Sequence, residues 1–390
     1  MMAELDPDSF PLVAIDPVAN GQNEWVALCL RVEGGAATAQ QLQAVFGTPD
    51  LLAAIAPLDG LLFIEHPAAL TPPVLALMPP SRIGFVVSAA ALAADGVARR
   101  LTELHEIGYR LWLDGAPPPG VKVPLALRTI ARDCGRDPVP AVQLAALFGP
   151  HLAFGVDSAA RLAQCETAGF DWFSGAYPHD PLLSGDKGDG TTQRRILTLL
   201  GLLSRDADSR EIEQQLKQDP ALSWHLLKLV NSAAFAVSTQ ITSFNQAISL
   251  LGRRQLQRWL QLLLYARQQP DGLPNLLLPL AARRAAQLEA LCKGAGGSRD
   301  DCDQAFMTGV FSLLDRLLHM PMTDIVGELC LPPQVSGALL QRSGEFGKWL
   351  RLTETHPSHA ALDEAGAARA DWWTSQLNAY HWAIQVGRNV

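Results

Sequence analysis

Gln218-Asp-Pro-Ala-Leu-Ser-Trp-His-Leu-Leu-Lys-Leu-Val-Asn-Ser-Ala-Ala-Phe235 decides the fold of the second half of the chain. Asp219 stands before Pro220, which puts a capping residue ahead of a proline at the first helical position. Apolar residues then recur at helical spacing, at Leu222, Leu226, Leu229 or Val230, and Ala233. This spacing predicts a helix with one buried apolar face.

The helical pattern continues beyond this stretch. Asn231 and Ser232 fall near the predicted helix end, where their side chains can bond backbone groups. Ile241-Thr-Ser-Phe-Asn-Gln-Ala-Ile-Ser-Leu-Leu-Gly252 follows, and its apolar residues before Gly252 are typical of a helix that ends on a left-handed glycine. A further helix is predicted over 253–268. From about Thr191 onward we therefore expect an all-helical bundle.

These two stretches together resemble the HDOD domain, an all-helical relative of the HD-type metal phosphohydrolases. The resemblance covers the chain from about Thr191 to its end and implies a non-catalytic domain. The residues that carry it are Asp219, Pro220, Leu229, Asn231, Ser232, Phe235, Leu251 and Gly252.

An HD phosphohydrolase needs a His-Asp pair on one helix as part of its metal site. The segment similar to that helix is Gly309-Val-Phe-Ser-Leu-Leu-Asp-Arg-Leu-Leu318. Asp315 is kept, but Leu314 stands where the histidine is expected, and leucine offers no lone pair. We therefore expect no metal in this half.

The first half alternates predicted strands with helices. Strands that are apolar on both faces and are joined by helices indicate a parallel sheet, either a barrel or a doubly wound sheet. The predicted strands are Trp25–Val32, Gly60–Ile64, Arg82–Val87, Tyr109–Leu113 and, more weakly, Gly120–Leu125 and His151–Val156.

Ser184-Gly-Asp-Lys-Gly-Asp-Gly190 is a polar, glycine-rich stretch between two apolar blocks. We place the domain boundary there. The sequence then divides into a first domain over 1–183, a linker over 184–190 and a helical domain over 191–390.

The first domain resembles the EAL domain, a TIM-barrel hydrolase of cyclic di-GMP. The matching segments are Leu152–Ser158 and Ala168–Tyr177, similar to the closing strands, Gly108–Asp114, and Val121–Val123, similar to the strand of the catalytic lysine. An EAL domain followed by HDOD is a known bacterial signalling architecture, the YuxH-like arrangement. A full TIM barrel takes about 250 residues, so the resemblance implies a shortened one.

The resemblance also implies that most ligands of the two divalent ions are lost, since such ions need oxygen donors. The opening glutamate position holds Ala27, the asparagine position Glu65, the second aspartate position Gly115 and the late glutamate position Phe154. Pro124 and Ser174 replace another acidic residue and a glutamine. The residues kept are Asp114, Lys122 and Asp157, with Arg31 as a possible phosphate contact. Asp114 and Lys122 could equally form an ion pair.

Composition narrows the function classes further. The 390 residues carry a net charge of −8, which argues against a protein that binds nucleic acid by neutralising phosphates. The longest apolar runs are far shorter than a membrane span, and the acidic start lacks a secretory pattern. The six cysteines show no CxxC spacing. We expect a cytoplasmic protein with reduced cysteines, no cofactor and no membrane partner.

Three functions follow as hypotheses. The first is a non-catalytic signal-transduction protein, with two degenerate domains that bind other signalling proteins. The alternative is a cyclic di-GMP receptor without hydrolysis, for which Arg31, Lys122, Trp112 and Trp172 are available. The third is a residual cyclic di-GMP phosphodiesterase. The aromatic segment 371–382 can close a helical core or form an interface.

Overall fold

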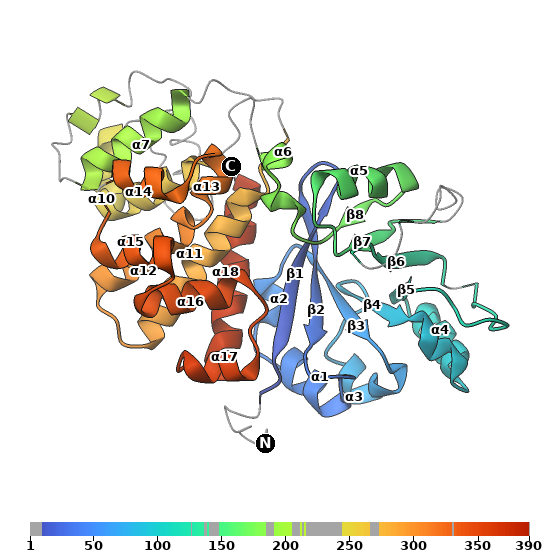
Figure 1. The fold of residues 1–390 in the computed structure, drawn as a ribbon. Helices are drawn as coiled ribbons and strands as arrows, with labels where there is room; N and C mark the ends of the chain where they lie inside the picture. Colours follow the sequence, from blue (N-terminus) through green and yellow to red (C-terminus); the bar gives the residue numbers. More distant parts are fainter. Residues whose placement is uncertain are drawn as a thin grey trace. The chain divides into compact units, whose positions relative to one another are not determined.

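A computed structural model describes residues 10–125, 127–135, 139, 148–184, 191–204, 211–212, 214–215, 244–265, 273–329 and 331–389. The chain divides into two compact units (Figure 1). The first comprises Met1–Leu183 with Ala368–Trp373, and the second Ser184–Ala367 with Thr374–Val390. Residues 368–373, which the sequence placed in the helical domain, thus group with the first unit. The residues predicted as a linker lie outside the described part of the chain, except Ser184.

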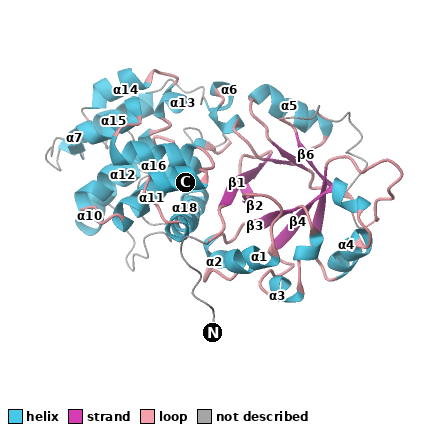
Figure 2. Cartoon of the chain, turned by 60° about the horizontal axis from the view of Figure 1, so that its bottom comes forward, coloured by secondary structure: helices cyan, strands magenta, loops and turns pink. Residues whose placement is uncertain are grey.

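Eight strands close a barrel in the first unit, which confirms the barrel and excludes the doubly wound sheet. Helices lie outside the ring of strands (Figure 2). The strands are β1 (Val13–Asn20), β2 (Trp25–Val32), β3 (Asp59–Ile64), β4 (Ile83–Ser88), β5 (Arg110–Asp114), β6 (Thr129–Asp133), β7 (Leu152–Phe154) and β8 (Trp172–Phe173).

Strand β1 departs from the predicted parallel sheet, because it pairs antiparallel with both β2 and β8. The turn from β1 to β2 is too short for a crossover helix, so the two strands form a hairpin. The Asn20 side chain holds this turn, accepting the amides of Gln22 and Glu24 at 3.0 Å each. The sequence did not predict β1 because Pro17 interrupts it, and proline seldom occupies a paired strand.

The predicted strand over Gly120–Leu125 is wrong. This segment is irregular, with Gly120 at a φ of 82°, and the sixth strand lies later, at Thr129–Asp133. Prolines 117–119 and Pro124 remove the amides that a strand ladder requires. All eight strands are present, so the shortening of the barrel lies in its connections.

The outer helices show where the barrel is shortened. Three of them, α2, α3 and α6, have only four residues each, and the described part of the β5–β6 connection contains no helix. The helices of this unit are α1 (Ala39–Phe46), α2 (Leu51–Ala54), α3 (Pro72–Leu75), α4 (Val97–Glu106), α5 (Ala159–Ala168) and α6 (Pro181–Ser184), of which the last ends in the second unit.

The second unit is helical throughout its described residues, as predicted. Its helices are α7 (Thr191–Ser204), α10 (Phe244–Leu263), α11 (Leu277–Gly294), α12 (Arg299–Phe311), α13 (Leu314–Leu318), α14 (Met322–Leu329), α15 (Pro333–Gln341), α16 (Gly344–Glu354) and α17 (His359–Glu364), together with most of α18 (Arg369–Asn389).

Helices α11 and α12 approach closely at Gly309. A Cβ atom built there would lie 2.4 Å from the Ala285 backbone, so only glycine fits. Helix α12 begins with a capping box, in which Ser298 Oγ accepts the Asp301 amide and the Asp301 carboxylate accepts the Ser298 amide. The close approach at Gly309 and the capped N-terminus at Ser298 together fix the position of α12 against α11.

Gly252 breaks helix α10. Its φ of 73° is positive, as the sequence predicted, but its ψ of 162° lies outside the left-handed helical region. This conformation is essentially restricted to glycine. Of the HDOD signature, Asp219, Pro220, Leu229, Asn231, Ser232 and Phe235 lie outside the described residues, as does the side chain of Leu251.

Further sequence expectations concern membranes, aromatics and cysteines. None of the described helices has the length and hydropathy needed to cross a membrane.

In the second unit, Tyr380 is buried and Trp382 packs on Trp259 with ring centroids 5.5 Å apart, so these aromatics close a core. The five described cysteines are free thiols and buried.

Candidate functional site at the carboxyl end of the barrel

The inside of the barrel is an apolar core. Because side chains alternate along a strand, residues two apart share a face. The inward set forms one packed cluster of Val18, Ala27, Cys29, Leu61, Val86, Trp112, Ala131, Leu152 and Phe154. Burial raises the pKa of the Cys29 thiol, with a smaller contribution from Asp16, so this sulfur stays protonated. Ala27, at the opening glutamate position, is fully buried in this cluster.

The two tryptophans offered by the receptor hypothesis belong to the same core. Trp112 is 1% exposed, and its Nε1 donates to the Pro150 carbonyl at 2.8 Å. Trp172 stacks on it with ring centroids 5.7 Å apart. Pro150 precedes β7, so this pair lies toward the amino end of the parallel strands.

At the carboxyl end, three side chains from β2, β3 and β7 contact one another. Arg31 Cζ lies 3.9 Å from the ring centroid of Phe63 and 4.8 Å from that of Phe154. The two rings meet edge to face, with centroids 5.2 Å apart and an interplanar angle of 87°. Phe154 is 8% exposed. We call Arg31, Phe63 and Phe154 the mouth cluster.

Arg31 is held at the mouth by aromatic contacts. Its Nε is buried and has no hydrogen-bond partner. A guanidinium over an aromatic face is attracted by the negative face of the ring. The mouth therefore carries a positive group, Arg31, the possible phosphate contact of the resemblance, packed against Phe154, which stands at the late glutamate position.

Of the other EAL positions, Asp114 lies at a strand end. It is the last residue of β5 and pairs in register with Ser88 of β4 and Ala131 of β6. Gly115 follows with a φ of 86°. Glu65 lies beyond the end of β3 and is exposed.

The match of Val121–Val123 to the lysine strand is wrong, because this segment is irregular. Lys122 is exposed, Pro124 lies in the same segment, and the described structure contains no Asp114–Lys122 ion pair. Strand β6 instead presents Ala131 to the barrel interior. The sequence misled here because a lysine between two valines imitates a strand.

Asp157 and Ser174 are not part of the mouth cluster. Asp157 is exposed, and its carboxylate accepts a hydrogen bond from Ser158 Oγ at 2.9 Å. Ser174 is buried after β8, where its amide donates to the Ala153 carbonyl at 2.9 Å. Both positions serve local structure.

Sequence reasoning missed Phe63 and Asp133. Phe63 points inward because it is two residues from the inward Leu61, a signal that strand alternation contained. Asp133 ends β6 opposite Phe154, and its carboxylate accepts the Gly135 amide at 3.0 Å. The strand of Asp133 is short and partly polar, so periodicity gave no signal. Among the described residues, no group of three or more His, Cys, Asp or Glu side chains is placed to hold a metal.

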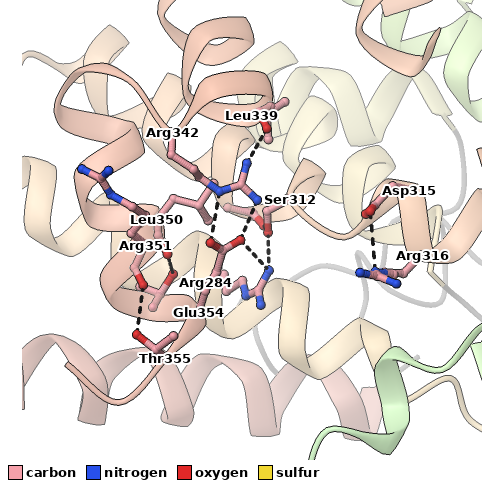
Figure 3. Close-up of polar contacts among 12 residues, drawn as sticks. Arg284, Ser312, Asp315, Arg316, Leu339, Arg342, Leu350, Arg351, Glu354 and Thr355 are labelled. Carbon is pink, nitrogen blue, oxygen red and sulfur yellow. Dashed lines mark hydrogen bonds and ion pairs between the residues drawn. The ribbon is translucent and has the colours of Figure 1, made fainter. Parts of the chain in front are cut away.

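The segment similar to the HD helix is broken. Helix α12 ends at Phe311 and α13 begins at Leu314. Leu314 is fully buried, and Asp315 pairs with Arg316 at 3.6 Å. Figure 3 shows this pair apart from the neighbouring polar network, with no dashed line between them. The residues present at the His-Asp position therefore do not fit a metal.

That network centres on Arg284, which the sequence did not single out (Figure 3). Arg284 Nη1 donates to Ser312 Oγ at 3.0 Å and lies 3.7 Å from Glu354 Oε1. Arg342 clamps the same carboxylate with two hydrogen bonds, of 3.0 and 2.7 Å. Burial, reinforced by the nearby Arg283 charge, lowers the pKa of Arg284 to about 10. This buried cation is a structural element of the helical unit.

Comparison with known proteins assigns residues 191–314 of the second unit. Residues 191–314 match the family model of the HDOD domain. The chain contains an HDOD domain, as predicted, and this domain follows a closed barrel in the order of the EAL-HDOD architecture. The residues after Leu314 are helical but lie outside the match.

Two curated relatives are similar to about half of the chain. YuxH of Bacillus subtilis (strain 168) is 29% identical over 206 residues, which is 52% of this chain and 50% of YuxH. The cyclic di-GMP phosphodiesterase CdgJ of Vibrio cholerae is 31% identical over 207 residues, 52% of this chain and 47% of CdgJ. The chain thus spans about half the length of the relatives it matches.

Solved EAL structures are also similar. A standalone EAL protein from Vibrio cholerae O395, bound to cyclic di-GMP, has a TM-score of 0.34 and 17% identity, and covers 45% of this chain and 92% of its own. The EAL domain of Mycobacterium smegmatis DcpA has a TM-score of 0.33 and 14% identity, and covers 42% of this chain and 89% of its own.

Proposed function

We propose that this protein is a non-catalytic component of bacterial cyclic di-GMP signalling that acts through protein–protein interaction. The observation that carries the proposal is the mouth cluster, in which Arg31 lies against Phe63 and Phe154 where a hydrolase would hold metal ions. The five buried thiols fit a reducing compartment, so we place the protein in the cytoplasm.

The proposal that the protein does not hydrolyse cyclic di-GMP rests on the oxygen ligands available at the barrel mouth. Two divalent ions need several oxygen ligands around one point, so that they can activate a water for attack on phosphorus. Here Ala27, Ala131 and Phe154 face inward as hydrocarbon.

The signalling context rests on the HDOD domain and on the similarity to CdgJ, which is named a cyclic di-GMP phosphodiesterase. Because only part of CdgJ is matched, its activity enters here as context for the proposal.

A receptor function is the second candidate, and Arg31 favours it. Its buried Nε lacks a hydrogen-bond partner, and a guanidinium is well suited to bind phosphate. Binding would require Phe154 to move aside. Residual phosphodiesterase activity is the third candidate, since Asp114 remains at a strand end.

The test is a hydrolysis and binding assay on the full chain with cyclic di-GMP, with and without Mn²⁺ or Mg²⁺. The proposal expects neither linear product by chromatography nor heat of binding by calorimetry. Turnover in the presence of metal would overturn it. Binding without turnover that is lost in Arg31→Met would establish the receptor function instead.

The interaction half of the proposal needs a separate test. Purified candidate signalling proteins are mixed with the full chain, and a complex of fixed stoichiometry is expected on gel filtration without cyclic di-GMP. If complexes form only after the dinucleotide is added, the receptor function is favoured.

A further inference from the structure

A polar cavity in the helical unit is assigned no role by the barrel or by the proposed function. It has a volume of about 430 Å³ and lies among α10, α11 and α12, which pack together in Figure 1. Ligand sites commonly begin at about 300 Å³. The lining includes Gly252, Arg254, Arg258, Glu289, Arg299 and Asp303.

The carboxylates of this cavity are already neutralised. Arg258 Nη2 lies 2.6 Å from Glu289 Oε1 and 2.7 Å from Asp303 Oδ1, and its Nη1 donates to Glu289 Oε2 at 3.2 Å. The Arg258 Cζ also lies 4.6 Å from the Phe306 ring centroid. Arg258 is therefore locked in place, and it forms a rigid wall of the cavity.

The other two arginines are more available. Arg254 pairs with Asp300 and Asp303, but its side chain is 46% exposed and that of Asp300 is 73% exposed. Such exposed pairs contribute little stability, so an incoming anion can compete for Arg254 at small cost. Arg299 makes no ion pair with any described residue and is exposed. Of the three arginines in the lining, Arg254 and Arg258 share Asp303 and also pair with Asp300 and Glu289, respectively, so Arg299 is the lining arginine left without an ion pair among the described residues.

The backbone at Gly252 also favours a ligand site at this cavity. Gly252 breaks α10 at the wall of the cavity in a conformation essentially restricted to glycine, and no atom lies within 4 Å of a Cβ added there. The break is not required by crowding at that point. Because Gly252 carries no side chain, a ligand in the cavity can approach the backbone there.

We propose that this cavity binds a small phosphate monoester, with the phosphate between Arg299 and Arg254 and the organic part in the remaining volume. Guanidinium groups bind phosphate oxygens through paired, charge-assisted hydrogen bonds. A free phosphate ion would fill only a fraction of 430 Å³. Because Arg258 pairs with Glu289 and Asp303, these two carboxylates repel the bound phosphate less.

The test is calorimetry on the full chain with three probes: adenosine 5′-monophosphate, inorganic phosphate and adenosine. The monophosphate is expected to bind, inorganic phosphate to bind more weakly, and adenosine not to bind. Arg299→Ala should weaken binding of the monophosphate roughly tenfold or more. Added salt should weaken it as well.

Arg351→Ala is the matched control, because Arg351 is an exposed arginine on α16, outside the cavity lining. It should bind the monophosphate as the unaltered protein does. Arg254→Ala gives a second, independent variant and should also weaken binding. The proposal is overturned if the monophosphate does not bind at about 1 mM, if inorganic phosphate binds equally well, or if Arg351→Ala weakens binding as much as Arg299→Ala.

Discussion

The Arg31 guanidinium lies over the face of the Phe63 ring, with its Cζ 3.9 Å from the ring centroid. The two residues occupy neighbouring parallel strands at the carboxyl end of the barrel, the edge where barrel enzymes place their chemistry. Phe154 closes against both from β7. Aromatic packing thus occupies this end of the barrel, and Phe154 stands at the position where the resemblance to EAL expects a glutamate.

Phe154→Ala is expected to lower the free energy of unfolding of the barrel by about 2–4 kcal/mol, because it leaves a cavity against Phe63 and Arg31. Urea denaturation followed by tryptophan fluorescence measures the change. The control is Phe148→Ala: Phe148 is 70% exposed, so its change should stay within about 0.5 kcal/mol. Equal effects of the two substitutions would contradict the packed mouth cluster.

Gly309→Ala is expected to destabilise the helical unit by about 2 kcal/mol or more, since the added methyl would collide with the Ala285 backbone of α11. Gly327 on α14 is the matched control, because no atom lies within 4 Å of a Cβ there. Gly327→Ala should stabilise by about 0.5–1 kcal/mol through helix propensity. Thermal unfolding of both variants measures the difference, and a shift of the same sign in both would refute the close approach.

Glu354→Gln is expected to cost about 2–4 kcal/mol of unfolding free energy, because it leaves the buried Arg284 and the nearby Arg342 without their shared carboxylate. Glu345→Gln removes a carboxylate on the same helix that pairs with Lys348 at 2.7 Å and is 59% exposed. That change should be within about 0.5 kcal/mol. Chemical denaturation distinguishes them, and a neutral Glu354→Gln would show that the network contributes no stability.

The pKa of Asp301 should lie below its usual range, because the Ser298 side chain and amide both donate to its carboxylate. A lowered folded-state pKa means that this carboxylate stabilises the α12 start above its unfolded pKa of about 3.9, and that the stabilisation is lost as pH falls through the folded value. Ser298→Ala should raise this pKa toward the usual range.

NMR titration of the Asp301 carboxyl measures this shift. Ser336→Ala, which removes a hydroxyl bonded to the Leu331 carbonyl on another helix, should leave the titration unchanged. An Asp301 pKa that does not respond to Ser298→Ala would exclude the capping box in solution.

Features with local causes could be predicted from sequence. The strand over Trp25–Val32 was placed to the residue, because a short run of apolar, β-prone residues is visible in a short window. The apolar residues Ala27 and Phe154, at positions where the resemblance expects glutamates, were also visible. The proline-interrupted β1 and the short, partly polar β6 were missed, since these strands are stabilised by their neighbours in the closed barrel.

The sequence by itself predicted a shortened, TIM-barrel-like first domain and an HDOD domain, and it indicated that most EAL ligand positions hold other residues, because each inference depends on residue identity or local period. Only the tertiary structure decided that Phe63, rather than Glu65, meets Arg31, and that Arg284, Arg342 and Glu354 share one buried network. These contacts depend on strand register and helix packing between distant segments. Such geometry is fixed by the closure of the whole core, which no short stretch of sequence encodes.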